Sequence, residues 1–451
     1  MSTPSKSPTP RDYRIPAKSP WSGAWRIPAA VGALGLGIAA WSYKIDPQRF
    51  AFSYLFAFFV ALSLPLGCLF FVLVQYITKS SWSVTVRRVA ELLMRPMPIF
   101  AVLVIPLVLT IGQLFPWLGA KHHETPEAES SQSEDVIAVS RGAEDREPAA
   151  MRDLPAANAT SVKRLDRAAE RADEAIMVHK RPYLNRQFFL IRLIAYLLIW
   201  TWLVQRYFRW STDQDQTKAL ENTAAAQSFA PLGLILFGVT LTFFSFDWLL
   251  SLDGTWYSTI FGVQVFAQCA LFQMASLILV TLWLRRSGLL GDAVSVEHYH
   301  DLGKFLFGWI VFWSYITFAQ FFLIWYSNIP DEVAWFHMRW NENGGTWKTL
   351  GLSLVVMHFF VPFWFLMSRN IKRRLPFLAV GAGCMVVMHV LEVYWIVMPN
   401  FGPLDPSLVD VGCFLGVFGV YLAAVLRGME DYSLVAVGDP RLPRALEFEN
   451  A

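Results

Sequence analysis

The chain has 451 residues, of which 55% are hydrophobic and only 16% charged, and its formal net charge is +3. Ordinary soluble domains carry about a quarter charged residues, so this composition excludes a typical soluble protein and predicts a membrane protein. The small net charge gives no reason to expect nucleic acid as a partner. The four cysteines lie in apolar stretches without a Cys-x-x-Cys pattern, so we expect neither an iron–sulfur cluster nor covalently attached haem on this chain.

The expected elements are transmembrane helices, because a helix needs about 20 apolar residues to cross the hydrocarbon core of a bilayer. About ten apolar stretches of this length predict an all-α polytopic helical bundle, with no soluble domain large enough to be an enzyme by itself. In chain order, the predicted spans cover residues 25–43, 50–77, 92–115, 187–208, 229–252, 258–284, 303–327, 348–368, 375–398 and 407–426.

Composition divides the chain into five segments. The polar, Pro-rich residues 1–24 form an N-terminal tail, and residues 25–119 hold the first three spans, of which the first is short and rich in glycine and alanine. Residues 120–186 are rich in Glu, Ala, Ser, Asp and Arg, which predicts a mostly disordered loop because such a segment cannot bury a core. Residues 187–427 hold the other seven spans, and residues 428–451 form a C-terminal tail.

The basic residues of the short loops set the expected orientation, because Lys and Arg are enriched on the cytoplasmic side of a membrane. One side receives most of them, in the N-terminal tail and near residues 79–95, 206–209, 285–286, 369–374 and 427. The short loops of the other side hold only Lys44, Arg49 and Arg339, with Lys348 at a helix edge. We therefore expect both termini in the cytoplasm and the 120–186 loop on the opposite side.

Ionisable groups inside hydrocarbon are costly, so each one in an apolar stretch is a functional candidate. His389 and Glu392 lie one turn apart on a single face of the ninth span, while His358 lies midway along the eighth. Such groups can carry protons, because carboxyl and imidazole groups exchange them near neutral pH; the alternative is that they only join helices by hydrogen bonds. The predicted proton-path residues are Asp247, His389, Glu392, His358, Glu91, Asp301 and Gln320.

The positions of these residues along the spans predict two half-paths that meet near the middle of the membrane. Asp247, His389 and Glu392 fall in the outer half, and Glu91 and Asp301 at the inner end, where contact with water is the simpler explanation of a carboxylate. Glu392 is expected to exchange protons with His389. Asp247 has no basic residue within a turn, so its partner must come from another helix or from water.

Two other functions fit parts of the pattern. His358 and His389 lie at a matching depth of about 15 Å on adjacent spans and could ligate a b-type haem. Only one such pair exists, whereas electron transfer across about 30 Å of hydrocarbon normally uses two haems. A secondary transporter would need internal repeats and broken helices in both halves; prolines interrupt several spans, but no repeat is apparent.

Several long segments resemble one known family. The hairpin Phe246–Gly262 (FDWLLSLDGTWYSTIFG) is similar to a signature of a large membrane subunit of bacterial alternative complex III, a protein of the polysulfide-reductase membrane-anchor type. The other matching segments are Trp82-Ser83 with Arg87, Arg88 and Glu91; Tyr183–Asn185 with Phe188, Phe189 and Arg192; His300–Phe307 (HDLGKFLF); Phe312–Ile316 (FWSYI); and Gln320–Pro330 (QFFLIWYSNIP). These segments are ordered and spread from about Ser81 to Arg427.

The resemblance implies a non-catalytic or quinone-binding subunit of a respiratory quinol:cytochrome c oxidoreductase in the bacterial inner membrane, with a role in proton translocation. It implies as partners a related quinol-binding membrane subunit, a multi-haem cytochrome and an iron–sulfur subunit. The haems and clusters would then lie in these partners, and the only ligand implied for this chain is a quinone or menaquinone. One position departs from the family: Gly254-Thr255 stand where a Pro-His pair is usual, so no imidazole role is carried over there.

Overall fold

The computed structural model describes residues 13–118, 174–340 and 345–449. The described chain is helical and contains no strand, which confirms the all-α class. It divides into two compact units: the larger comprises the described residues up to 115 and from 187 onward, and the smaller the described residues between 116 and 186. In the smaller unit residues 174–180 are helical, while most of the loop expected to be disordered, residues 119–173, lies outside the described part.

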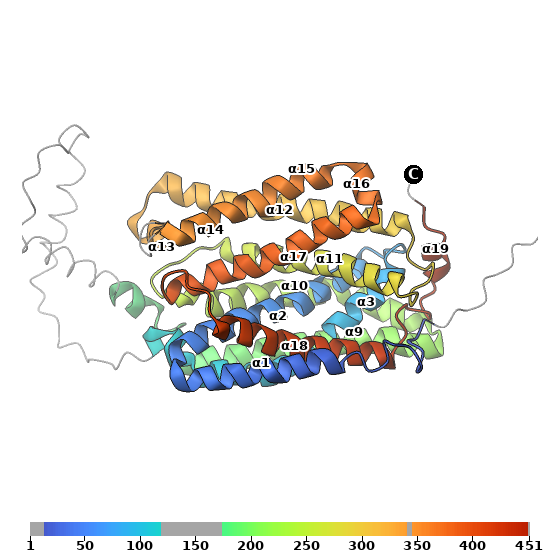
Figure 1. The fold of residues 1–451 in the computed structure, drawn as a ribbon, viewed down its shortest axis with the longest axis horizontal. Helices are drawn as coiled ribbons and strands as arrows, with labels where there is room; N and C mark the ends of the chain where they lie inside the picture. Colours follow the sequence, from blue (N-terminus) through green and yellow to red (C-terminus); the bar gives the residue numbers. More distant parts are fainter. Residues whose placement is uncertain (1–12, 119–173, 341–344, 450–451) are drawn as a thin grey trace, which may run out of the picture. The chain divides into compact units, whose positions relative to one another are not determined.

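Nine helical segments in the described residues are long and apolar enough to cross a bilayer, which confirms a multi-pass membrane protein. Within the larger unit these helices run side by side (Figure 1). They are α2 (Pro47–Ile77), the segment Val84–Leu109, α9 (Arg186–Thr217), α10 (Leu220–Trp248) extended to Leu252, α11 (Phe261–Arg286), α12 (Val296–Ser327), the segment Thr346–Met367, α17 (Leu375–Val397) extended to Asn400, and α18 (Leu408–Asp431).

The tenth expected span is helix α1 (Arg26–Ile45), which lies against α18 (Figure 1). Glycines of the two helices meet so closely that a Cβ added to Gly35 would lie 2.3 Å from the backbone nitrogen of Gly416. Small residues permit such close approach between transmembrane helices. Helix α1 is not among the nine segments of the described chain that are long and apolar enough to cross a bilayer by the same criterion.

Several helices are longer than the apolar stretches that predicted them. Helix α9 continues to Thr217 through the polar sequence Ser211–Thr217, and α10 and α12 begin at Leu220 and Val296, before their apolar parts. With 32 residues, α9 is about 48 Å long, whereas the hydrocarbon core is about 30 Å thick. The helices therefore extend beyond the bilayer as polar turns, which hydropathy alone does not detect.

Two of the spans are irregular. The third starts as α3 (Val84–Met94) and continues, past Pro96 and Pro98, as the short helices η1 (Met97–Ile99), α4 (Phe100–Leu103), α5 (Ile105–Leu109) and α6 (Ile111–Leu114), because proline lacks the N–H that a regular helix needs. The eighth consists of α14 (Thr346–Leu354), the π-helical turn η6 (Val355–Phe360) and α15 (Val361–Met367). A short helix α13 (Pro330–Trp340), not expected from the sequence, lies between α12 and α14.

The residues after α18 fold back onto the bundle. The backbone N–H of Leu434 donates to the Tyr13 carbonyl at 3.0 Å, and Ala436 packs with Ala445 of α19 (Leu442–Leu446) against Val84 of α3. The remaining short helices are η2 (Pro116–Leu118), η4 (Leu250–Leu252), α16 (Arg369–Arg373) and η7 (Met398–Asn400). The C-terminal tail is thus a packed part of the larger unit; on which side of the membrane it lies stays a prediction.

Candidate functional site

The carboxyl group of Glu392 lies at the meeting point of three helices. Glu392 belongs to α17 and is 2% exposed. Its Oε1 accepts hydrogen bonds of 2.7 Å from Gln268 Nε2 of α11 and from Trp313 Nε1 of α12. Both donors are electrically neutral, so a proton can be added to Glu392 or removed from it without breaking an ion pair with Arg or Lys.

His358, in the π-helical turn η6, is the imidazole nearest to this carboxyl group. Its Nδ1 lies 3.7 Å from Glu392 Oε2, and its ring stacks on Trp313 with 3.9 Å between the centroids. Neither nitrogen of His358 nor Glu392 Oε2 has a hydrogen-bond partner among the described residues. A separation of 3.7 Å is too long for a direct hydrogen bond but suits a bridging polar atom. π-Helical turns are frequent at functional sites, and this one carries His358.

His389 does not pair with Glu392, contrary to the expectation from their spacing on α17. Its Nε2 lies 2.8 Å from Ser63 Oγ, and the Ser63 hydroxyl donates its only hydrogen to the Val60 carbonyl at 2.8 Å. The imidazole Nε2 therefore carries a hydrogen and donates it to Ser63, which leaves Nδ1 as an acceptor. The ring also stacks on Phe272 with 4.2 Å between the centroids. The spacing on one helix predicted a pair, but the neighbouring helices supply closer partners.

A cavity of about 440 Å³ borders the Glu392 centre. Gln264 of α11 and Glu392 of α17 are among its lining residues, with Trp313 and Thr317 of α12. Most of the other lining side chains are aromatic or aliphatic. Cavities of this size and chemistry are typical of sites for small apolar ligands that are oriented by a few polar groups.

Asp247, at the end of α10, is held in a different way. Its two carboxylate oxygens accept hydrogen bonds of 2.8 Å from Arg192 Nε and Nη2 of α9, and Tyr196 Oη donates to the same carboxylate at 2.7 Å. Arg192 is the partner that was expected from another helix or from water. Arg192 was not identified from the sequence as an ion-pair partner. Arg192 lies inside the apolar sequence Phe188–Trp200, and an ionisable residue in such a stretch is a candidate for the same reason as Asp247.

Glu91 belongs to a third, separate cluster, in which Glu91, Arg87 and Arg88 are completely buried. It accepts from Arg87 Nε at 3.0 Å and from Arg88 Nε at 2.9 Å. Arg87 further binds Asp439 at 2.8 Å, and Arg88 binds Asp215 at 2.6 Å. Glu91 is 0% exposed. Contact with water, which would explain a carboxylate at a helix end, therefore does not explain Glu91.

The pKa of Asp439 reflects its place in this cluster, outside the membrane-spanning segments. Burial by itself would raise the pKa, but the hydrogen bond from Arg441 and the charges of Arg87 and Arg441 outweigh burial and hold the pKa well below its usual range. Asp439 is therefore ionised in the folded protein at neutral pH, and it pairs with Arg441 at 2.9 Å as well as with Arg87.

The other predicted residues lie apart from the Glu392 centre. Asp301 pairs with Lys304 at 2.5 Å near the start of α12. Gln320, further along α12, is 3% exposed, and its Oε1 has no hydrogen-bond partner in the described ranges. Asp410, another carboxylate near a helix end, accepts from Ser53 Oγ at 2.5 Å and from the backbone N–H of Ser407, so it caps α18. Of the predicted residues, the structure thus brings together His358 and Glu392, with His389 bound to Ser63 beside them.

The two intramembrane histidines do not fit a b-type haem. His389 already binds Ser63, one ring face of each histidine is covered by an aromatic side chain, and neither residue lines the 440 Å³ cavity or the 340 Å³ cavity beside it. Within the described residues, no three side chains of His, Cys, Asp and Glu gather in an arrangement that would hold a metal ion.

Comparison with known proteins gives no family for the chain: a scan against family models finds no match, and a search of curated proteins finds no similar sequence.

Proposed function

We propose that this chain is a membrane subunit of a bacterial respiratory quinol:cytochrome c oxidoreductase of the alternative complex III type. In this proposal the chain lies in the inner membrane with both termini in the cytoplasm. A related quinol-binding membrane subunit, a multi-haem cytochrome and an iron–sulfur subunit are its partners and hold the redox centres. The sequence resemblance between Ser81 and Arg427 supports this assignment, and the multi-pass helical fold agrees with it.

The role that we propose for the chain itself is proton transfer through Glu392 during quinol oxidation. One observation carries this role: Glu392 is buried, accepts hydrogen bonds from the neutral side chains of Gln268 and Trp313, and has a second oxygen 3.7 Å from an imidazole nitrogen. Such a carboxyl group can accept and release a proton with little rearrangement, and His358 is suitably placed to exchange it. Asp247, in contrast, would have to break its ion pair with Arg192 to do the same.

The test is the purification of a tagged full-length chain in mild detergent, followed by identification of what co-purifies and by an absorption spectrum. We expect haem- and cluster-bearing subunits to accompany the chain. In the reconstituted complex, Glu392→Gln should reduce quinol turnover and proton release by about tenfold or more, because a general acid–base group contributes about 10²–10⁴-fold when it acts in the transition state. Asp431→Asn, at an exposed position near the end of α18, is the control and should keep full activity.

A secondary transporter is the second candidate, because the third and eighth spans are irregular and broken helices often line transport sites. The eighth span contributes His358 to the Glu392 centre, whereas no residue of the third takes part in the contacts described for that centre. A chain that purifies alone and carries a solute across vesicle membranes would support the transporter. Full quinol turnover in an assembled Glu392→Gln complex would overturn the proton-transfer role.

A further inference from the structure

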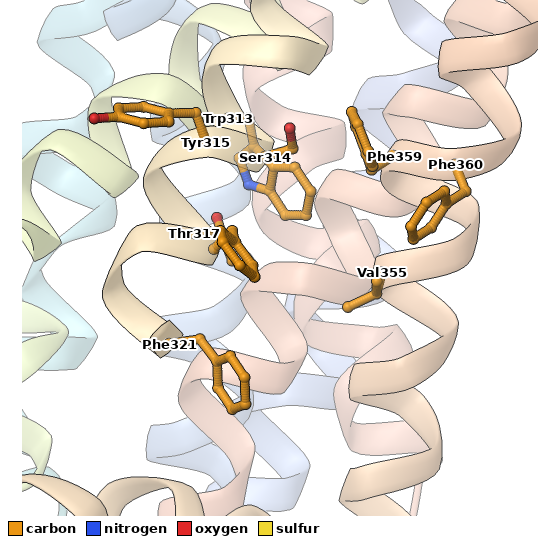
Figure 2. A pocket seen from close by; sticks show the side chains of 9 residues that line it. Trp313, Ser314, Tyr315, Thr317, Phe321, Val355, Phe359 and Phe360 are labelled. Atoms are coloured by element: carbon orange, nitrogen blue, oxygen red, sulfur yellow. The ribbon is translucent and has the colours of Figure 1, made fainter. Parts of the chain in front are cut away.

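A groove beside the Glu392 centre is open toward the side of the helix bundle. It consists of the 440 Å³ cavity and an adjoining cavity of about 340 Å³ that share lining residues between α12 and the irregular eighth span. Figure 2 shows Trp313, Thr317 and Phe321 on one helix facing Val355, Phe359 and Phe360 on the other. The rim side chains are well exposed, Phe360 at 50% and Val355 at 46%. These two helices are the least buried of the nine spans in the described chain, so the groove opens on a face of the bundle that the described residues leave uncovered.

The inner wall of the groove combines aromatic rings with a few polar atoms. Rings of two other elements reach it: Phe336 and Trp340 from α13, and Trp395 from α17. Trp395 can lie close to α14 because residue 351 is glycine; a Cβ there would be 3.1 Å from its indole nitrogen. The polar residues of the larger cavity are Gln264, Thr317 and Glu392, and the smaller cavity adds the hydroxyl groups of Ser314 and Tyr315.

Two buried oxygen atoms of these polar residues have no hydrogen-bond partner in the part of the chain that the structure describes. They are Thr317 Oγ1 and Glu392 Oε2. Buried polar atoms are normally hydrogen-bonded, so we expect a ligand or a water molecule to supply the partner that the described residues do not. Among residues 13–118, 174–340 and 345–449, no Lys, Arg or His side chain lines either cavity, so the described groove offers no countercharge to an anionic lipid headgroup. The chemistry favours a neutral ligand with a hydrogen-bond donor.

We propose that this groove binds a neutral molecule of the bilayer that has a flat ring, a hydroxyl group and a long apolar tail. The ring lies between the aromatic walls, the hydroxyl donates to Glu392 Oε2 and accepts from the Thr317 hydroxyl, and the tail leaves between Phe318 and Phe360 toward lipid. A membrane quinol has this chemistry, and so has a ring-bearing lipid alcohol. The identification of the ligand as a quinol rests on the proposed function; the groove and its access to Glu392 do not.

The first test is chemical labelling of the full-length chain in lipid nanodiscs with dicyclohexylcarbodiimide, an apolar reagent that adds to protonated carboxyl groups. We expect mass spectrometry of peptides to find the adduct on Glu392 and not on Asp247, which binds Arg192 and lines neither cavity. Absence of the adduct from Glu392, or equal labelling of the two carboxyl groups, would overturn access through the groove.

Protection from labelling identifies the ligand. A long-chain quinol should slow the modification of Glu392, and its dimethyl ether, which has the same ring and tail but no hydroxyl donor, should not. A polycyclic alcohol such as cholesterol distinguishes a quinol from a lipid alcohol as the ligand. Protection by cholesterol and not by the quinol would assign the groove to a lipid alcohol. Protection by none of these compounds, or equal protection by the ether, would overturn the proposed binding mode.

Two adjacent valines provide matched variants. Val355 and Val356 both lie in the π-helical turn and are 46% and 48% exposed, but only Val355 lines the groove. Val355→Phe should lower the labelling rate and weaken quinol binding by about tenfold, equivalent to about 1.4 kcal/mol, because its ring fills the groove. Val356→Phe should change both by less than about twofold. Equal effects of the two substitutions would contradict a ligand in the groove.

A further variant keeps the test valid if Val355→Phe does not fold. Thr317→Val preserves the shape of the side chain and removes one of the two oxygens, so it should weaken quinol binding while leaving carbodiimide access to Glu392 intact. Unchanged binding in this variant, with Glu392 still labelled, would remove Thr317 from the site and contradict the proposed polar contacts. This result does not depend on the proposed function. If the proposed function is wrong, the chain will purify without haem- or cluster-bearing partners.

Discussion

Asp247 and Glu392 are both carboxyl groups buried inside the bundle, yet their surroundings differ in charge. Asp247 faces the guanidinium group of Arg192 and the hydroxyl of Tyr196, so its negative charge is matched within the protein. Glu392 faces an amide, an indole and an imidazole, and one of its oxygens has no partner in the described chain. The difference shows that burial of an ionisable group does not by itself indicate function. We therefore base the proposed roles of the two groups on the charge and completeness of their partners.

The largest expected effect on stability comes from removing the positive charge of the Arg192–Asp247 pair. Arg192→Met leaves a buried carboxylate without its cation and should lower the free energy of unfolding by about 3–5 kcal/mol, seen as a lower melting temperature in detergent. The double variant Arg192→Met with Asp247→Leu should recover part of this loss because neither charge remains. Arg209→Met, at an exposed position of the same helix, is the control. A melting temperature of Arg192→Met equal to that of the wild type would mean that the pair is not structurally important.

A smaller effect, with a pH dependence, is expected at the other ion-paired cluster. Asp439→Asn should destabilise the protein at pH 7 by about 3 kcal/mol, the lower end for a broken buried pair, because Arg87 keeps Glu91 as a partner. The folded-state pKa of Asp439 is depressed, so its stabilisation is fully present above the unfolded-state pKa of about 4 and is lost as the pH falls toward the folded-state value.

The measurement is the difference in melting temperature between wild type and Asp439→Asn at several pH values. The difference should be constant from pH 7 to about pH 5 and should narrow below about pH 4. Asp431→Asn, which removes an exposed carboxylate 3.6 Å from Arg427, should show no such difference. A difference in melting temperature that increases as the pH falls would contradict the depressed pKa of Asp439.

The smallest effect on stability is expected at Glu392. In Glu392→Gln the amide oxygen can still accept from Gln268 and Trp313, and the amide nitrogen can donate toward His358, so the free energy of unfolding should change by less than about 1 kcal/mol. If this variant has the melting temperature of the wild type and yet loses quinol turnover, Glu392 differs from Asp247 in contributing to turnover and not to stability. A loss of stability as large as that of Arg192→Met would show that Glu392 is also a structural group.

The fold class and most of the spans could be predicted from the sequence because apolar stretches of about 20 residues have few alternatives in a bilayer. The ends of α9, α10 and α12 could not, since their outer turns are polar and resemble loops. Helix α13 was missed for the same reason: Pro330–Trp340 carries charges and is too short to span.

The partners within the site were harder to predict than the site residues themselves. Glu392 and His358 were identified as candidates because each is an ionisable group in an apolar stretch, but spacing along one helix predicted the wrong neighbour for Glu392. Contacts such as Arg88 with Asp215 join residues far apart in the sequence, and nothing local marks them as a pair. A single sequence shows which ionisable groups lie in apolar stretches, whereas the tertiary structure determines which partners stabilise each of them.

The contact between α1 and α18 has a consequence for biosynthesis. Helix α1 packs chiefly on α18, and within the described chain the only other helix with extensive contacts to it is α2. During translation α1 therefore emerges long before its main partner exists, while Gly32 and Gly35 leave it with little side-chain surface of its own to bury. Helix α1 must therefore remain in the membrane without its main partner until α18 has been inserted, so this contact forms late in the assembly of the bundle.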